Sequence, residues 1–130
     1  MTKENKRQVG TKYEKLAGDF LIGQGYEILC YNYRCFHGEI DIVAIEDETL
    51  VFCEVKYRSS SLGGNPLEAV DARKQQVIYK CAMNYLSFER LNLGEKSKLH
   101  KSKGEIPCRF DVIGFVGDEI SHVKNAFGGS

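Results

Sequence analysis

The sequence lacks the features of a membrane-spanning or exported protein. No apolar run approaches the ~20 consecutive residues that a helix needs to cross a bilayer. The first eight residues are polar and do not contain the apolar segment of a signal peptide. We therefore expect a cytoplasmic protein that does not contact a membrane.

A paired cysteine motif is also missing. None of the cysteines forms Cys-x-x-Cys, and their number is odd: Cys30, Cys35, Cys53, Cys81 and Cys108. Reduced thiols are therefore expected. A soft-metal site at Cys30, Cys35 and His37 is disfavoured, because Cys30 lies in an apolar segment and no fourth ligand is evident.

Neither positive nor negative charge is in excess in the sequence. The chain has 18 basic and 18 acidic side chains, so its net charge is zero. This neutrality counts against strong, indiscriminate binding to nucleic acid, which depends on many phosphate contacts. A local basic patch is still compatible with it. Four lysines gather between residues 96 and 103, where a solvated loop is preferred over a binding surface.

The length of 130 residues, without repeats or low-complexity tracts, predicts a single domain. Residues 1–9 are predicted to form a mobile tail and residues 10–127 the domain. A flexible polar loop is predicted at about residues 92–107. The sequence indicates no boundary between two domains.

Apolar periodicity predicts the order α-β-β-β-α-β-β. One helix is expected from about Gly10 to Gly23, and a second from the N-cap Asn65 to about Phe88 or Leu91. Strands are expected at residues 26–34, 38–45, 50–58, 108–116 and 119–124. Because the second helix can cross over, the fourth strand can return parallel to a neighbour. We predict an α/β domain with a central mixed β-sheet flanked by helices.

The stretch from Gly38 to Arg58 carries the most informative pattern. Two Ile- and Val-rich runs flank a short acidic break, which predicts a β-hairpin. A two- or four-residue turn places Asp41 opposite Glu54 and Glu39 opposite Lys56. A three-residue turn would instead put Asp41 and Glu54 on opposite faces.

Two facing carboxylates repel each other unless a cation joins them or one takes up a proton. Oxygen ligands suit Mg²⁺ or Mn²⁺, and a nearby lysine can orient a water or neutralise a phosphate. The alternative is an edge hairpin with solvated charges, in which Glu39 and Lys56 form an ordinary cross-strand pair. The spacing alone leaves both interpretations open.

Asp41, a strand break and Glu54-Val55-Lys56 resemble the core motif of the PD-(D/E)xK nuclease superfamily. Longer strings narrow the resemblance: residues 25–29, 32–34, 38–41, 50–58, 64–70 and 109–112. Together they resemble the YraN-like family of small bacterial proteins, predicted nucleases related to archaeal Holliday-junction resolvases. The resemblance covers roughly residues 10 to 127, and it implies a restriction-endonuclease-like core.

The resemblance also implies a function, a Mg²⁺- or Mn²⁺-dependent nuclease that cleaves DNA, including branched or junction DNA. Asp41 and Glu54 would hold the ion, with the Val55 carbonyl as a further ligand. Lys56 would position the attacking water or stabilise negative charge. Glu39 would tune Lys56 or reach a second ion.

Further residues enter through the same resemblance. Glu14, on the first helix, is expected to orient metal-bound water. Arg58, Lys74 and Gln75 are expected to contact nucleic acid, and Gln75 with Tyr79 resembles an accessory motif of some superfamily members. A homodimer would suit a junction resolvase, because two symmetric cuts need two sites. The alternatives are a nucleic-acid-binding module that does not cut and an interaction protein with an idle site.

Overall fold

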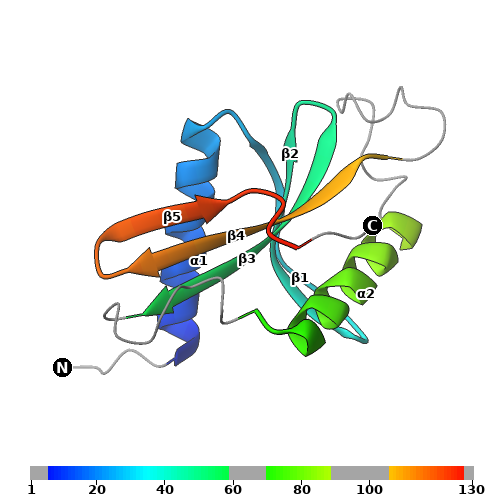
Figure 1. The fold of residues 1–130 in the computed structure, drawn as a ribbon, viewed down its shortest axis with the longest axis horizontal. Coiled ribbons are helices and arrows are strands. Elements are labelled where there is room, and N and C mark those ends of the chain that lie inside the picture. The colour runs from blue at the N-terminus through cyan, green and yellow to red at the C-terminus, as the bar shows by residue number, and fades with distance from the viewer. Residues whose placement is uncertain (1–5, 59–69, 89–105, 128–130) are drawn as a thin grey trace.

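The computed structural model describes residues 6–58, 70–88 and 106–127. Its elements follow the predicted order (Figure 1): α1 (Lys6–Gly23), β1 (Glu27–Cys35), β2 (Gly38–Glu46), β3 (Thr49–Arg58), α2 (Ala72–Phe88), β4 (Cys108–Val116) and β5 (Glu119–Val123). The α/β class is therefore confirmed. Within these residues, no helix has the length and apolar character needed to cross a membrane.

The five strands form one mixed sheet in the order β1-β2-β3-β4-β5. Neighbouring strands are antiparallel except β3 and β4, which are parallel. The predicted parallel return of the fourth strand is thus confirmed. Figure 1 shows α1 behind the sheet and α2 in front of it, as expected for a sheet flanked by helices.

Strand β3 is buried on both faces of the sheet. Its residues Leu50 and Phe52 join the cluster that packs on α2, whereas Val51 and Cys53 join the cluster that packs on α1. Side chains alternate between the faces of a strand, so a strand covered on both sides needs a continuous apolar run. This explains why the sequence of β3 is apolar without interruption until Glu54.

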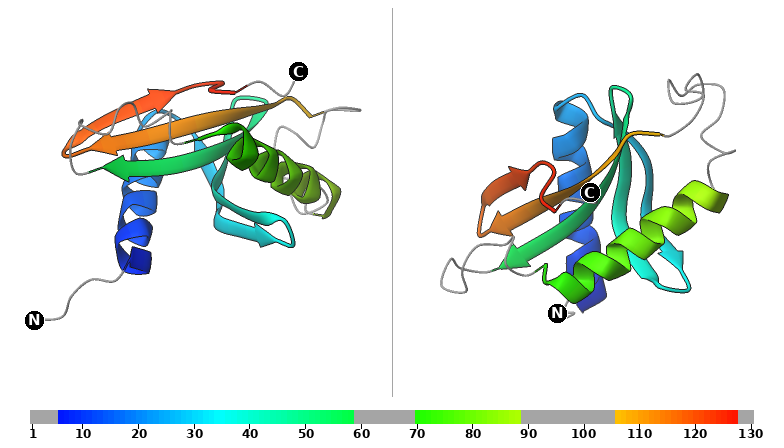
Figure 2. Two further views of the ribbon diagram at one scale, coloured as in Figure 1. Left: turned by 60° about the horizontal axis from the view of Figure 1, so that its bottom comes forward. Right: turned by 45° about the vertical axis from the view of Figure 1, so that its right-hand side comes forward.

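The β1–β2 hairpin changes the direction of its side chains part-way along. Tyr31 lies against Gly18 of α1, whereas the Tyr33 hydroxyl donates to Asn84 of α2 at 2.6 Å. Asn32 between them has a φ of 55°, a left-handed conformation that asparagine tolerates better than most residues. The end of the hairpin therefore projects from the plane of the other strands (Figure 2) and reaches α2.

Helix α2 begins later than predicted. Asn65 lies outside the described residues, but Val70 and Asp71 are not helical, so a continuous helix from Asn65 is wrong. The Asp71 carboxylate accepts a hydrogen bond from the backbone N–H of Lys74 at 2.9 Å, which is the geometry of an N-cap. The cap at Asp71 therefore fixes where the helix starts.

Helix α1 begins earlier than predicted, at Lys6 rather than near Gly10. Four residues of the expected N-terminal tail are consequently helical. Lysine, arginine and glutamine have good helix propensity, and this local preference extends the helix beyond the apolar stripe on which the prediction was based.

Candidate metal centre

The hairpin of β2 and β3 has the predicted register. Ile42 pairs with Cys53, at the end of an antiparallel ladder that begins at the turn. This confirms the two- or four-residue turn and excludes the three-residue alternative. The ladder ends one step before Asp41 and Glu54, so these two residues lie where the strands separate.

The Asp41 carboxylate bridges the strands at this opening. Its Oδ2 accepts a hydrogen bond from the backbone N–H of Val55 at 2.8 Å. A side chain therefore joins β2 to β3 beyond the end of the ladder and orients the Asp41 carboxylate. The contact involves the Val55 N–H, and a metal-binding role for the Val55 carbonyl stays a prediction.

Three carboxylates from α1 and β2 converge at the same place. Ligand oxygens of Glu14, Glu39 and Asp41 all lie within 4.8 Å of one another, and all three side chains are half-buried. One divalent ion can bridge oxygens at such spacing after small adjustments. Glu14 also borders a cavity of about 350 Å³ between α1 and β1, which gives a small ligand access to it.

Glu54 is a buried carboxylate on the neighbouring strand, with a side chain only 4% exposed. Its Oε1 lies 3.4 Å from the Lys56 ammonium and 3.6 Å from that of Lys74. Within the described part of the chain, its other oxygen, Oε2, has no hydrogen-bond partner. A buried carboxylate oxygen without a hydrogen-bond partner lowers the stability of the folded protein unless a proton or a cation binds it.

Burial and repulsion between neighbouring carboxylates raise the pKa of two of these groups. Burial and the charge of Asp41 raise the pKa of Glu14 from 4.5 to about 7. Burial and the charge of Asp41 also raise the pKa of Glu54 to about 7, although Lys74 and Lys56 act in the opposite direction. Asp41 is therefore the electrostatic link between Glu14 on one side and Glu54 on the other.

The chemistry of these residues fits a hard divalent cation. All the candidate side-chain ligands are carboxylates, which suit Mg²⁺ and Mn²⁺ better than softer metals. The unpartnered Glu54 oxygen and the raised pKa values are the features that a cation would relieve. Glu54 does not belong to the tight group of Glu14, Glu39 and Asp41. An ion that binds both Asp41 and Glu54 therefore requires the Glu54 side chain to move towards this group.

The sequence model of one protein family, described as "Uncharacterised protein family UPF0102", matches residues 13–115. The chain belongs to the UPF0102 family. It is 45% identical to the UPF0102 protein of Lachnoclostridium phytofermentans over 95% of both chains. It is 43% identical to that of Caldicellulosiruptor bescii, over 95% of this chain and 99% of the relative. The resemblance to the YraN-like family is thereby confirmed.

The ion pairs in this UPF0102 protein differ from the predicted ones. Glu39 lies 3.5 Å from Arg34 of β1, its partner in the β1–β2 register, and Lys56 contacts Glu54 instead. The alternative in which Glu39 and Lys56 form an ordinary cross-strand ion pair is therefore wrong. Because β2 and β3 separate after the ladder, the strand that remains beside Glu39 is β1.

Two of the three residues predicted to contact nucleic acid have described side chains in this UPF0102 protein, and their contact with nucleic acid stays a prediction. Lys74 lies beside Glu54, closer to the carboxylates than the sequence indicated. The Gln75 amide donates to the Val70 carbonyl at 3.1 Å, which fixes its orientation. The side chain of Arg58 lies outside the described residues.

Asn32 is a site residue that the sequence interpretation missed. A hydrogen bond from Asn32 acts on Glu14 and lowers its pKa in part. The same residue has the left-handed conformation that turns the β1–β2 hairpin. Its only signal in the sequence is a polar side chain between Tyr31 and Tyr33, inside a run of apolar and aromatic residues that starts at Ile28.

A second polar cluster surrounds Asp111, which is fully buried on β4. Its carboxylate accepts hydrogen bonds from Arg109 at 3.0 Å, His122 at 2.8 Å and the Asn125 backbone N–H at 3.0 Å. Burial alone would raise the pKa of Asp111, but the bonds from His122 and Arg109 lower it below its ordinary value. Hydrogen bonds and the ion pair with Arg109 therefore satisfy this buried carboxylate, which indicates a structural role.

The raised pKa values predict how the metal-free UPF0102 protein responds to pH. Glu54 titrates near 7 when folded and near 4.5 when unfolded. The folded state therefore holds more protons between these values, and stability falls as pH rises through this window. We expect the melting temperature in EDTA to fall from about pH 5 to about pH 8, and to fall less for Glu54→Gln.

Glu48→Gln is the matched control for this pH series, because Glu48 is exposed in the turn after β2. It should follow the wild-type profile. Parallel profiles for the wild-type protein and Glu54→Gln would show that Glu54 does not carry the raised pKa.

Proposed function

We propose that this UPF0102 protein is a metal-dependent nuclease that hydrolyses phosphodiester bonds in DNA, with branched or junction DNA as its substrate class. The observation that carries this proposal is the unpartnered oxygen of Glu54, buried beside the charge of Asp41 and a lysine on the same strand. We place its action in the cytoplasm. The sequence resemblance to PD-(D/E)xK nucleases supports the reaction class.

Asp41 and Glu54 are the proposed side-chain ligands of Mg²⁺ or Mn²⁺, and the Val55 carbonyl is the proposed further ligand from the protein. When bound, such an ion polarises the phosphate and lowers the pKa of a bound water. The hydrogen bond from the Val55 N–H orients Asp41. Glu14 and Glu39, whose oxygens lie close to those of Asp41, orient water or hold a second ion.

Lys56 is the proposed catalytic cation. Its ammonium lies 3.4 Å from Glu54, so it is held beside a ligand without itself being able to bind metal. From this position it can orient the attacking water or stabilise the negative charge that develops on the phosphate. Lys74, Gln75 and Arg58 are the proposed contacts to the nucleic acid.

The second candidate function is binding of branched or single-stranded nucleic acid without cleavage. The net charge of zero favours it, because an endonuclease acting on duplex DNA usually gains affinity from many basic contacts. In either case a homodimer is the proposed state for junction DNA, since two symmetric strands need two equivalent sites.

Purified protein tests both candidates on linear, flapped and four-way DNA, with Mg²⁺, Mn²⁺ or EDTA. We expect cleavage with either metal and none in EDTA. Metal should also raise the melting temperature, because a ligand bound only by the folded state adds stability. Binding without cleavage under all conditions would favour the second candidate, and the absence of both metal effects would refute the metal site.

A further inference from the structure

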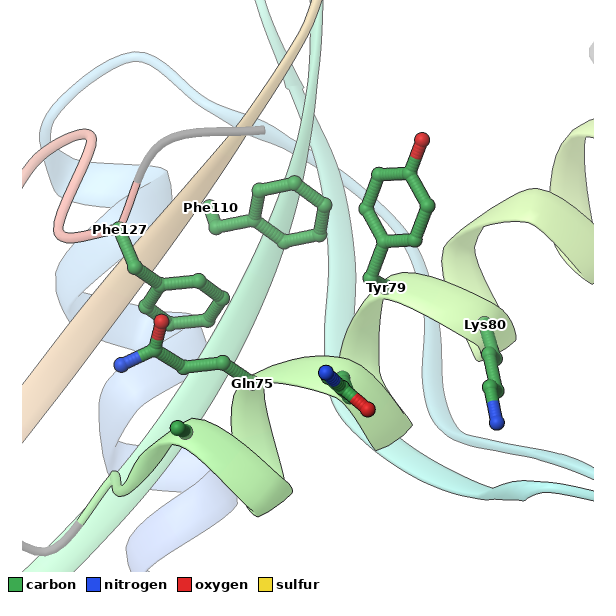
Figure 3. A pocket seen from close by; sticks show the side chains of 7 residues that line it. Gln75, Tyr79, Lys80, Phe110 and Phe127 are labelled. Atoms are coloured by element: carbon green, nitrogen blue, oxygen red, sulfur yellow. The ribbon is translucent and has the colours of Figure 1, made fainter. Parts of the chain in front are cut away.

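A cavity of about 400 Å³ opens beside α2, on the face of the sheet that this helix covers. Its walls come from three separate parts of the chain, namely α2, β4 and the residues after β5 (Figure 3). The lining residues are Ala72, Gln75, Gln76, Tyr79, Lys80, Phe110 and Phe127. The proposed metal centre does not use this cavity.

Three aromatic rings form one wall of the cavity. Phe110 and Phe127 are stacked with their ring centroids 5.1 Å apart, and the centroid of Tyr79 lies 6.3 Å from that of Phe110. Phe110 is buried, whereas Tyr79 is 44% exposed. The Ala126 N–H donates to the Phe110 carbonyl at 2.7 Å, and this bond holds Phe127 against β4. Tyr79 therefore offers a ring to a ligand while the two phenylalanines form a fixed backing.

The polar part of the lining is neutral or basic. Gln75 reaches towards Phe127, and Lys80 points away from the rings (Figure 3). The two amides of Gln75 and Gln76 can each donate and accept hydrogen bonds. None of the seven lining residues is acidic. This lining suits a planar, uncharged group with donors and acceptors on its edge, attached to an anionic group outside the cavity.

The cavity lies close to the proposed metal centre. Lys74, adjacent to Gln75 on α2, is 3.6 Å from Glu54. On the sheet, Phe110 pairs with Phe52, two residues before Glu54 on β3. A strand of nucleic acid that places a phosphate near Glu54 can therefore place a neighbouring base at the cavity.

We propose that this cavity binds an unpaired base of single-stranded nucleic acid, stacked on Tyr79 and contacted at its edge by Gln75 and Gln76. The choice of a nucleic-acid strand as ligand rests on the proposed function, whereas the preference for a flat, uncharged group rests on the cavity itself. Stacking on an aromatic side chain typically strengthens binding about tenfold or more per base. A flap or a junction supplies such unpaired bases, and an intact duplex does not.

The test is equilibrium binding of labelled oligonucleotides in EDTA, which separates base binding from cleavage. The probes are a DNA strand, its RNA equivalent, the same DNA strand with abasic sites, and a duplex. Tyr79→Ala should weaken binding of the base-bearing strands about tenfold and leave binding of the abasic strand unchanged. Tyr79→Phe keeps the ring and should bind like the wild-type protein.

Phe88→Ala is the matched control, because Phe88 is a 71% exposed aromatic residue on the same helix but outside the cavity. It should not change binding, and all variants should melt like the wild-type protein. Equal affinity of the wild-type protein for base-bearing and abasic strands, or an unchanged affinity in Tyr79→Ala, would overturn the proposal.

These binding measurements, combined with the cleavage assay in Mg²⁺ or Mn²⁺, separate this proposal from the proposed nuclease. Base-dependent binding through Tyr79 without metal-dependent cleavage would refute the nuclease and keep the base-binding cavity. Metal-dependent cleavage with no effect of Tyr79→Ala on strand binding would keep the nuclease and refute the cavity's role. Binding of aromatic peptides in place of every oligonucleotide would also overturn it.

Discussion

Lys56→Ala is expected to slow DNA cleavage about 10²- to 10³-fold while metal binding is largely retained. Lys56 lies beside Glu54 but offers no lone pair as an ammonium, so its loss should not empty the metal site. What it removes is an electrostatic donor to the water or to the developing charge on the phosphate. The measurements are single-turnover cleavage of one DNA substrate and metal affinity by calorimetry.

Comparison variants make this result specific to Lys56. Glu54→Ala should weaken metal binding itself, because it removes a proposed ligand. Lys56→Arg should not restore cleavage, since the planar guanidinium does not replace a compact ammonium. Lys12→Ala, at an exposed position on α1, should cleave like the wild-type protein. Normal cleavage by Lys56→Ala would remove Lys56 from the mechanism.

Asp111→Ala is expected to cost about 3–5 kcal/mol of unfolding free energy, the usual effect of removing one partner of a buried ion pair. Asp111 is fully buried, and its loss leaves Arg109 without its carboxylate partner on β4. It also removes the acceptor for His122 and for the Asn125 N–H. Urea unfolding followed by circular dichroism measures the change.

Asp118→Ala is the control for this prediction, because Asp118 is exposed in the turn between β4 and β5. It should change the unfolding free energy by less than about 0.5 kcal/mol. If Asp111→Ala does not fold, Asp111→Asn should be less destabilised, because its amide oxygen still offers an acceptor to the groups that Asp111 binds. A loss under about 1 kcal/mol in Asp111→Ala would contradict the structural role.

The strands and the hairpin register could be predicted because their signals are local. Alternating and continuous apolar runs identify strands, and the short acidic break before Thr49 restricts the turn. A two- or four-residue turn predicts the observed register, whereas the sequence left a three-residue turn open until the structure excluded it. The convergence of Glu39 and Asp41 on one cluster also followed from this local pattern.

Other parts of the site depend on interactions that the sequence does not display. The left-handed Asn32 changes the direction of the side chains along β1. Glu39 lies beside Arg34 and not Lys56 because the β2–β3 ladder ends before these residues. The position of Lys74 beside Glu54 depends on where α2 starts, and the Asp71 cap sets that point. Both features combine a local conformation with packing between distant segments, which no periodic pattern reveals.

The parallel pairing of β3 with β4 has a consequence for how the chain folds as it is synthesised. Every proposed ligand lies at or before Val55, but the second edge of β3 has no partner until β4 has left the ribosome. Until then β3 exposes unpaired backbone groups and an apolar strand, the situation in which nascent chains associate wrongly. Non-local strand pairing of this kind also slows folding. The carboxylate cluster can therefore become rigid only when β4 has been synthesised, well after its own residues. The interval before β4 emerges is the period in which the nascent chain most needs protection from aggregation.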